Sequence, residues 1–439
     1  MQGERKTLTQ LSVPICLETL FYMLSGMVDT LMLSSVSDQA VGAVGTANTY
    51  ISVFIIMFGV ISSGMVAVMS QNIGAGRPGI AYQARQLGLV FNALTGILMS
   101  VVLAVFSGGI LRAVSIAPAL LESAETYLKI VGGASFLNAL IPIFSSYLRV
   151  FGYTKHSLIG TVVGNVINII LNSVFLFVFH WGVMGVATAT VISKVVNLII
   201  VAAMGAVLIK AKQSPERAQP RRILAQIVKI GFPSVFETAL YNVAMTFIVC
   251  FMNHMDTDGM NVTARSYAMQ IANFSYCVGA ALAQANAIMT GWRIGAKKYE
   301  ECDRGTRKAV IYGLVTATCF SVTFAITGRF IVHIFTNDIQ MIELVVKLLV
   351  VDIFLEFGRV TNLVYGQALK TSGDAIFPVI MGAIFMYLFA VGGTYFLGIH
   401  MGLLAVGAYI AMAGDECARA VGMVLRWKSG KWKSKSLVE

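Results

Sequence analysis

Two carboxylates lie within the first long apolar stretch of the chain, where an ionised group needs a polar partner. Glu18 and Asp29 are 11 residues apart. At about 100° per residue this spacing returns them to one face of a helix, about 16 Å apart along its axis. A charge at bilayer depth costs about 2.5–3.5 kcal/mol on insertion scales, so each is a candidate for function. We expect an acidic helix face that looks into a polar cavity. The alternative is that Asp29, close to the end of its stretch, reaches water on its own.

The second half of the chain carries its own group of charges inside apolar sequence. Asp352 and Glu356 are spaced i,i+4 and share a helix face, while Glu356 and Arg359 are spaced i,i+3 and can pair. Buried acids of this kind can bind and release a cation, whereas a neutral Glu356–Arg359 pair would be structural. Both interpretations stay open for these three residues.

Two further sets of charges have less certain partners. Asp415, Glu416 and Arg419 lie near the end of the last apolar stretch, and their spacing predicts a structural or gating pair. Lys194 can pair with Asp29 or Asn172, or its long stem can carry the ammonium to an interface.

The elements that must hold these side chains are membrane-spanning helices. Hydrophobic residues make up 57% of the 439 residues and charged residues only 12%, with a mean hydropathy of +0.78. Apolar runs recur that are long enough to cross a hydrocarbon core of about 30 Å as helices and too long for barrel strands. The sequence predicts an all-α membrane protein. We expect twelve spans, at residues 12–34, 44–69, 86–107, 126–148, 158–179, 184–209, 227–253, 262–290, 308–332, 341–366, 375–397 and 402–426.

A polar connection divides the spans into two sets of six. Residues 210–222 read KAKQSPERAQPRR, a composition typical of an inter-lobe linker. The sequence therefore predicts an N-terminal lobe at 1–209, a cytoplasmic linker at 210–222 and a C-terminal lobe with a basic tail at 223–439.

The basic residues predict the topology. If the N-terminus is placed inside, 23 Lys and Arg residues, Arg5 among them, fall in loops and ends on that side, against Arg112 and Arg329 on the other. This is a strong positive-inside bias and predicts a multi-pass protein of the cell (inner) membrane with both termini cytoplasmic. The formal net charge of +11 is then a topology signal and a contact with anionic lipid, not a nucleic-acid surface.

Short motifs recur between the halves. Pro14, Glu18 and Tyr22 return as Pro233, Glu237 and Tyr241, at an offset of 219. Three further matches follow in order, Ile73-Gly74-Ala75 with Ile294-Gly295-Ala296, His180-x-Gly182 with His400-x-Gly402, and a weak alignment of 149–157 with 367–375 at an offset of 218. An even number of spans per repeat predicts two lobes related by a pseudo-two-fold axis along the membrane normal, with a substrate site near the midplane. Tyr22 and Tyr241, beside the repeated Glu residues, are the preferred candidates for substrate contact.

Several of these segments resemble motifs of the MATE (multidrug and toxic compound extrusion) family, prokaryotic type. "VMSQNIGAGR" (68–77) is similar to the family loop after the second span, and "RIGAKKYEEC" (293–302) to its counterpart in the second half. "GMVDTLMLS" (26–34), "GVMGVATAT" (182–190) and "ALKTSGDAIFP" (368–378) resemble three further family motifs. The resemblance covers nearly the whole chain and implies a twelve-helix exporter that moves drugs or metabolites outward in exchange for H⁺ or Na⁺.

The resemblance also implies candidate coupling residues. In DinF-type members the acid that matches Asp29 is central to cation coupling, and its partners match Asn168, Asn172 and Thr190. The family often has a carboxylate where this chain has Asn172, which favours a proton over a high-affinity Na⁺ site; the Asn residues can also be ordinary interhelical contacts. NorM-type members couple through an acid that Glu356 matches.

The sequence thus predicts a cation-coupled antiporter that works by alternating access. Its candidate cation-coupling residues are Asp29, Asn168, Asn172, Thr190 and Glu356, and its candidate substrate-cleft residues are Glu18, Tyr22, Glu237, Tyr241, Asp352 and Arg359. The expected substrate is a small organic molecule, cationic or amphiphilic, and we expect a monomer with no metal or cofactor beyond the H⁺ or Na⁺ gradient. The alternative is a flippase of lipid-linked precursors from the same superfamily, which needs a strongly cationic cleft. An enzyme is not expected, because no catalytic motif is found.

Overall fold

The computed structural model describes residues 6–113, 116–255 and 259–438. Arg5, which enters the charge argument, lies outside them, as do the side chains of Asp38, Lys212 and Gln213. The described ranges are mostly helical and contain no strand. The helices gather into two compact units, Met1–Lys6 with Leu17–Gly231 (unit 1) and Thr7–Cys16 with Phe232–Glu439 (unit 2).

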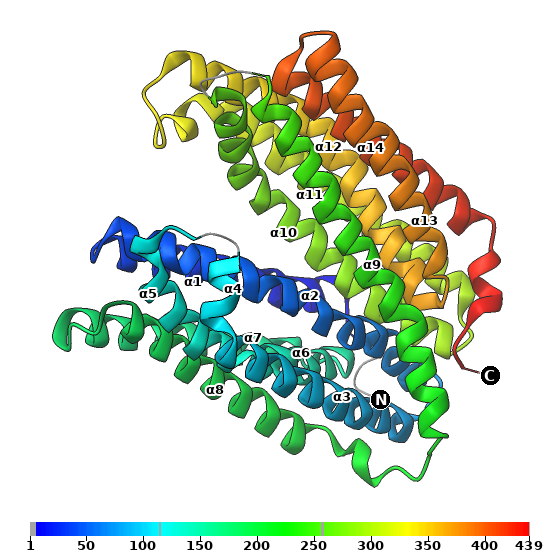
Figure 1. Cartoon of the computed structure of the whole chain (residues 1–439). Helices are drawn as coiled ribbons and strands as arrows, with labels where there is room; N and C mark the ends of the chain where they lie inside the picture. The colour runs from blue at the N-terminus through cyan, green and yellow to red at the C-terminus, as the bar shows by residue number, and fades with distance from the viewer. Residues whose placement is uncertain (1–5, 114–115, 256–258, 439) are drawn as a thin grey trace. The chain divides into compact units, whose positions relative to one another are not determined.

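Unit 1 holds the helices of the first half (Figure 1). They are α1 (Leu8–Ser34, whose first residues belong to unit 2), α2 (Asp38–Gly74), α3 (Pro78–Val105), α4 (Ser107–Ala113), α5 (Pro118–Tyr127), α6 (Ser135–Val150), α7 (Thr154–Ser173) and α8 (Gly182–Leu208). π-helical segments follow α5 (Leu128–Gly132) and α7 (Val174–Val178), and a short 3₁₀ segment, Lys210–Gln213, follows α8.

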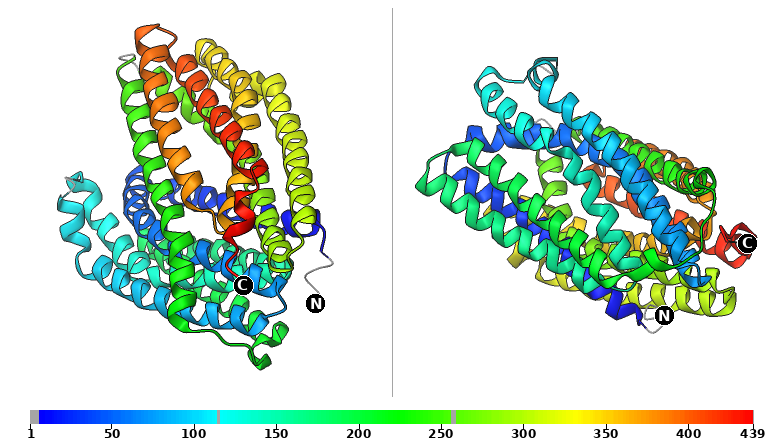
Figure 2. Two further views of the ribbon diagram at one scale, coloured as in Figure 1. Left: turned by 90° about the vertical axis from the view of Figure 1, so that its right-hand side faces the viewer. Right: turned by 90° about the horizontal axis from the view of Figure 1, so that it is seen from below.

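Unit 2 is built around α12, which packs against α10, α11 and α14; these helices run side by side in the left view of Figure 2. Its helices are α9 (Pro220–Asn253, whose first turns belong to unit 1), α10 (Met260–Gly295), α11 (Tyr299–Val332), α12 (Ile339–Ser372), α13 (Ile376–Phe385) and α14 (Leu404–Lys428). Two π-helical segments, Met386–Val391 and Thr394–His400, continue α13, and a 3₁₀ segment, Lys431–Lys435, closes the chain.

The helices match the predicted spans. Among the described residues, eight helices are long and apolar enough to cross a bilayer, and the bent pair α5–α6 makes a ninth. The other three, α10, α12 and α14, are 36, 34 and 25 residues long but more polar. A helix of about 20 residues already spans the hydrocarbon core, so length does not exclude them. Their polar residues must instead face other helices or a cavity. Two of these helices carry charged groups described above: α12 carries Asp352, Glu356 and Arg359, and α14 carries Asp415, Glu416 and Arg419.

Local signals in the sequence set where the helices begin. Ser37 caps α2 by accepting a hydrogen bond from the backbone N–H of Ala40 at 3.0 Å, and Asp338 caps α12 by accepting one from Gln340 at 2.9 Å. Pro78 and Pro118 stand at the first turns of α3 and α5, where a missing N–H costs nothing.

The backbone shows the repeat more sharply than the sequence does. Four positions with positive φ in unit 1, Gly76, Gly152, His180 and Gly182, have counterparts 221 or 222 residues later, at Lys297, Gly373, Gly402 and Leu404. A left-handed conformation disfavours side chains, so His180, Lys297 and Leu404 are held there by the fold. The two halves therefore share their turns even where the glycine has been exchanged.

One alignment predicted from the sequence is wrong. After α6, the N–H groups of Gly152 and Tyr153 donate to the carbonyls of Arg149 and Leu148; after α12, those of Gly373 and Asp374 donate to Lys370 and Leu369. These are the same helix-end motif. The offset in this region is 221, not 218, and it makes Arg149 and Lys370 equivalent. The short motif shared by 149–157 and 367–375 was too weak to fix the register.

Candidate functional site

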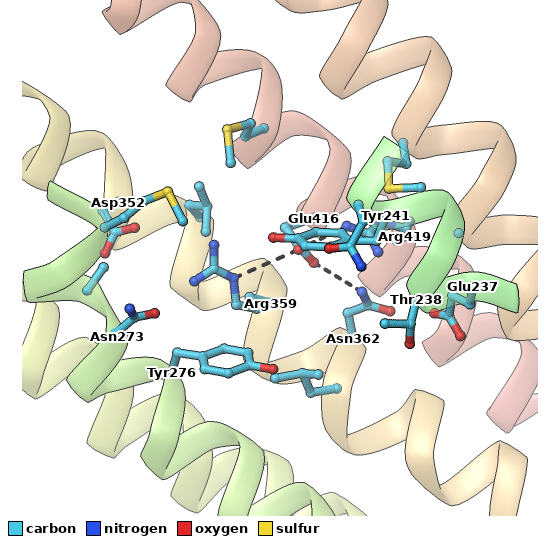
Figure 3. Close-up of a pocket in the computed structure, with 18 of the residues that line it drawn as sticks. Glu237, Thr238, Tyr241, Asn273, Tyr276, Asp352, Arg359, Asn362, Glu416 and Arg419 are labelled. Atoms are coloured by element: carbon cyan, nitrogen blue, oxygen red, sulfur yellow. Dashed lines mark hydrogen bonds and ion pairs between the residues drawn. The ribbon is translucent and has the colours of Figure 1, made fainter. Parts of the chain in front are cut away.

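Unit 2 encloses a pocket of about 470 Å³ between α9, α10, α12 and α14, with α13 at one side (Figure 3). The more polar helices of this unit thus turn their polar residues inward. The lining residues on which the argument depends are Glu237, Tyr241, Asn273, Tyr276, Asp352, Arg359, Asn362, Lys370, Gly382, Glu416 and Arg419. Four of the predicted substrate-cleft residues, Glu237, Tyr241, Asp352 and Arg359, therefore share one cavity.

A glycine lets the two most charged helices approach each other. A Cβ on Gly358 of α12 would lie 2.6 Å from the backbone nitrogen of Cys417 and 2.7 Å from the carbonyl carbon of Glu416, both on α14. No side chain fits there without moving backbone. The close approach brings Arg359, the next residue on α12, beside Glu416.

Ion pairs continue across the middle of the pocket. Arg359 pairs with Glu356, and its Nε lies 3.8 Å from Oε1 of Glu416. Glu416 also accepts a hydrogen bond from Asn362 at 3.0 Å and pairs with Arg419 at 2.9 Å. The dashed lines in Figure 3 mark the Arg359 and Asn362 contacts. Arg359 is thereby shared by two carboxylates.

The network continues from Arg419 to a second acid. Arg419 forms a two-pronged pair with Asp415, at 2.6 and 2.9 Å. The prediction that Asp415, Glu416 and Arg419 pair with one another describes these contacts, but it did not include the link from Glu416 to Arg359.

Asp352 and Glu237 lie at opposite ends of the pocket in Figure 3, with Arg359 and Glu416 between them. The Asp352 side chain is almost fully buried and is near enough to Arg359 to interact with its charge. Tyr276 places its ring 5.8 Å from the Arg359 guanidinium carbon. Glu356 does not line the pocket: it lies behind Arg359, where Ser275 also contacts it at 3.5 Å.

The other end is formed by Glu237 and Lys370, whose Oε2 and Nζ lie 2.5 Å apart. The Glu237 side chain keeps 23% of its surface exposed and the Lys370 side chain 14%. Gly382 of α13 adjoins this carboxylate: a Cβ there would meet Oε1 of Glu237 at 3.5 Å, an ordinary contact distance. Both members of the pair line the cavity.

In unit 1, the equivalent carboxylate is enclosed. Glu18 pairs with Arg149 at 2.8 Å, and its side chain is only 2% exposed. It accepts hydrogen bonds from Ser157 at 3.0 and 3.1 Å and from Thr161 at 3.3 Å. Tyr22, one turn further along α1, is about half exposed. The structure thus buries Glu18 in an ion pair, whereas the sequence predicts a substrate-cleft residue at this position.

The predicted coupling residues of unit 1 also come together. The Asn172 amide donates a hydrogen bond to Oδ1 of Asp29 at 2.6 Å and a second to Asn168 at 3.3 Å. Lys194, which the sequence could not place, is near enough to interact with the charge of Asp29. A carboxylate, an ammonium and two amides from α1, α7 and α8 therefore share one polar site in unit 1.

One residue of this site escaped the sequence analysis. Tyr127 is buried at the end of α5, near enough to Asn48, Thr190 and Asp29 to interact with them electrostatically. The π-helical segment Leu128–Gly132 begins directly after it. Such bulges are frequent at functional sites, but nothing in the sequence of this segment marks one.

A protein-family model described as MatE matches residues 14–174 and 233–396. The two matched segments start at Pro14 and Pro233, the first residues of the internal repeat, and cover most of the chain. The chain belongs to the MatE family. The resemblance carried by the short motifs is confirmed.

Curated relatives of this MatE protein span its whole length. It is 32% identical over 437 residues to "Uncharacterized transporter YisQ" of Bacillus subtilis, covering 98% of this chain and 96% of the relative. It is 26% identical over 456 residues to "Probable multidrug resistance protein NorM" of Thermotoga maritima, covering 99% and 94%. The first relative is named as a transporter and the second as a multidrug resistance protein. The MatE chain is a multi-pass membrane protein of a transporter family.

Solved structures confirm the fold. "Crystal structure of MATE in the bent conformation" superposes with a TM-score of 0.89 at 18% identity, covering 98% of this chain and 97% of that one. "Outward-facing conformation of a multidrug resistance MATE family transporter of the MOP superfamily" gives a TM-score of 0.88, also at 18% identity, covering 97% and 96%. The predicted all-α fold of twelve spans in two six-helix lobes is confirmed.

Proposed function

We propose that this MatE protein is a cation-coupled antiporter that exports small amphiphilic molecules across the cell membrane. The observation that carries the proposal is the pocket of unit 2, a cavity of about 470 Å³ lined by charged and aromatic side chains within membrane-spanning helices. Polar cavities at bilayer depth mark substrate or ion pathways. The multidrug relatives support the direction of transport. The positive-inside bias supports a protein of the inner membrane with cytoplasmic termini.

The lining suits an amphiphile better than a strongly hydrated ion. Tyr241 and Tyr276 offer aromatic faces, and Met269, Met386 and Met412 are flexible enough to adapt to different shapes. Carboxylates at both ends, Glu237 and Asp352, favour a positively charged group on the substrate. A flexible apolar lining with few fixed polar contacts is typical of promiscuous binders.

Coupling belongs to unit 1 in this proposal. Asp29 has amide and ammonium neighbours, Asn172 and Lys194. Because the Lys194 ammonium already lies near Asp29, a metal ion bound there would place two positive charges close together. A proton can instead bind to the carboxylate and neutralise it. Protonation would neutralise the carboxylate that Lys194 and Asn172 stabilise. It would thereby shift the equilibrium toward the arrangement of the helices that favours a neutral Asp29. H⁺ is therefore the proposed coupling ion.

The alternative of a flippase for lipid-linked precursors is less well supported. A pyrophosphate headgroup needs free cationic side chains. Each of the three basic residues that line the pocket, Arg359, Lys370 and Arg419, is already paired with a carboxylate. The pocket charges thus favour a cationic amphiphile.

Replacing Asp29 tests the coupling. The Asp29→Asn variant keeps the shape but cannot take up or release a proton, so pH-gradient-driven export of ethidium from proteoliposomes should fall at least tenfold while the protein remains folded. Glu343→Gln, which removes an exposed acid, is the control and should transport normally. Substrate-induced proton release from the detergent-solubilised protein, measured with and without Na⁺, identifies the ion. Normal export by Asp29→Asn would remove Asp29 from the mechanism, and a strict requirement for Na⁺ would rule out proton coupling.

A further inference from the structure

The internal repeat provides a comparison within the molecule for the Glu237 end of the pocket. The helix-end motifs make Arg149 and Lys370 equivalent, so each half pairs the glutamate of its first span with a basic residue at the end of its fourth. The pair itself has thus been duplicated. What surrounds it has not.

Two hydroxyl groups that hold Glu18 have no counterpart in unit 2. At the same offset of 221 residues, Ser157 corresponds to Pro378 and Thr161 to Gly382, and neither replacement has a side-chain donor. Gly382 nevertheless occupies the corresponding place, because a Cβ there would touch Glu237. The carboxylate of Glu237 is left with Lys370 as its ion-pair partner among the described residues.

The basic partner of the carboxylate also differs, because unit 1 has Arg149 where unit 2 has Lys370. Arginine presents a planar fork of donors that fixes a carboxylate, whereas lysine is a point charge on a flexible four-carbon stem. Arg419 adds a favourable field at Glu237, but its guanidinium is committed to Asp415 and Glu416. Glu18 is therefore held by three side chains, and Glu237 by one ammonium on a flexible stem beside the cavity.

We propose that Glu237 is the cation-binding carboxylate of the pocket and that Lys370 is its built-in competitor, an exchangeable counter-ion that a monovalent lipophilic cation displaces. This rests on the proposed function, because it assumes that substrate enters this pocket. The Lys370 ammonium keeps Glu237 neutralised while the pocket is empty. When an organic cation binds, Lys370 swings away on its stem and leaves the carboxylate to the ligand.

An internal competitor lowers the apparent affinity by the fraction of time that the carboxylate is free. If the Glu237–Lys370 pair is closed about 90% of the time, its removal strengthens cation binding about tenfold. An uncharged ligand gains nothing from the freed carboxylate. Lys370 is therefore a specificity-determining residue. It favours ligands whose positive charge is able to displace it from Glu237.

The first test rebuilds the clamp of unit 1 in unit 2. Gly382→Ser places a hydroxyl beside Glu237, and Gly382→Ala adds the same Cβ without it. Binding of tetraphenylphosphonium, a permanent lipophilic cation, is measured with the purified full-length protein by equilibrium dialysis. We expect Gly382→Ser to bind it about tenfold more weakly than Gly382→Ala. The added hydroxyl donates a hydrogen bond to Glu237, so the carboxylate gains less free energy when the ligand cation takes the place of Lys370. Equal affinities of these two variants would contradict the proposal.

The second test removes the competitor. Lys370→Gln should bind tetraphenylphosphonium about tenfold more tightly than the wild type, and should bind the uncharged N-phenyl-1-naphthylamine as before. Lys129→Gln is the matched control, because it removes a lysine paired at 2.7 Å with Glu125, outside the pocket. If the wild type binds the cation and Lys370→Gln binds it no better, Lys370 is no competitor. If the wild type binds neither probe, the proposed function itself fails.

Discussion

Glu18 in unit 1 and Glu237 in unit 2 occupy equivalent places in the repeat, but they differ in their partners and in the exposure of the carboxylate. Glu18 has an arginine and two hydroxyl groups and is 2% exposed; Glu237 has a lysine and is 23% exposed beside a cavity. One copy fastens α1 to α6 and α7. The other, on the same scaffold, is free to exchange its partner.

The sixth span of each half shows a second contrast. Counted from the shared turn at Gly182 and Leu404, Lys194 of α8 corresponds to Glu416 of α14. Lys194 faces the carboxylate of Asp29, and Glu416 faces the guanidinium of Arg359. A charge stands at this place in both units, but its sign is reversed. The duplicated backbone therefore places a charged side chain at this position in both halves, and the sign of the charge differs between them.

The largest effect that separates the two glutamates should appear in stability. Arg149→Met leaves the buried Glu18 without its cation and should cost about 3–5 kcal/mol. Lys370→Met should cost only about 1 kcal/mol, because water in the pocket can solvate Glu237. Thermal unfolding of both variants in the same detergent gives the comparison. Equal losses would show that the two pairs are alike and would undermine the contrast drawn here.

A smaller loss is expected where α12 meets α14. Gly358→Ala should destabilise the protein by about 1–3 kcal/mol, because its Cβ would overlap the α14 backbone. The added Cβ would push α12 and α14 apart. This movement should also weaken the Arg359–Glu416 contact and with it ligand binding. In unit 1, the equivalent residue of α6 is Leu137, which packs in a small apolar cluster with Ala134 and Ile141. Leu137→Ala should reduce stability as well but leave ligand binding in unit 2 intact, and equal effects on binding would argue against a local role for Gly358.

The sequence predicted most of the fold because long apolar runs, positive-inside charges and repeated motifs are local signals. It also predicted that Asp29 meets Asn172, since the family resemblance supplied their relation, and that Glu356 meets Arg359, since they are one turn apart. It did not predict the partner of Glu237. Lys370 is far away in the sequence, and the weak alignment at an offset of 218 concealed its equivalence to Arg149. Pairings between distant helices depend on packing that periodicity does not encode.

The contact between Asp374 and the C-terminal tail is another pairing of segments that are distant in the sequence. It is a further difference between the units. Asp374 follows α12, where unit 1 has Tyr153. Its carboxylate is almost fully buried and accepts hydrogen bonds from Arg426 at 2.7 and 3.3 Å and from Lys435 of the tail at 2.8 Å. Trp432 of the tail stacks on Trp427 with ring centroids 4.2 Å apart. An acid in the place of the tyrosine thus fastens the basic end of the chain to unit 2.

The pH dependence of this docking tests it with the smallest expected effect. Burial alone would raise the pKa of Asp374, but the hydrogen bonds and charges of Arg426 and Lys435 outweigh it and hold the pKa below its ordinary value. A lowered pKa stabilises the folded state above the unfolded value of about 3.9, and the contribution is lost as the pH falls through the folded pKa. Hydrogen exchange of residues 431–437 should therefore be slow and constant from about pH 8 to pH 5, after correction for the intrinsic exchange rate, and protection should fall below about pH 4. Asp374→Asn should lose about 1–2 kcal/mol of this protection at pH 7 and with it the acid transition, since an amide cannot neutralise two cations. Wild-type protection in the variant would mean that the tryptophan stack alone holds the tail, and Trp432→Ala would then release it.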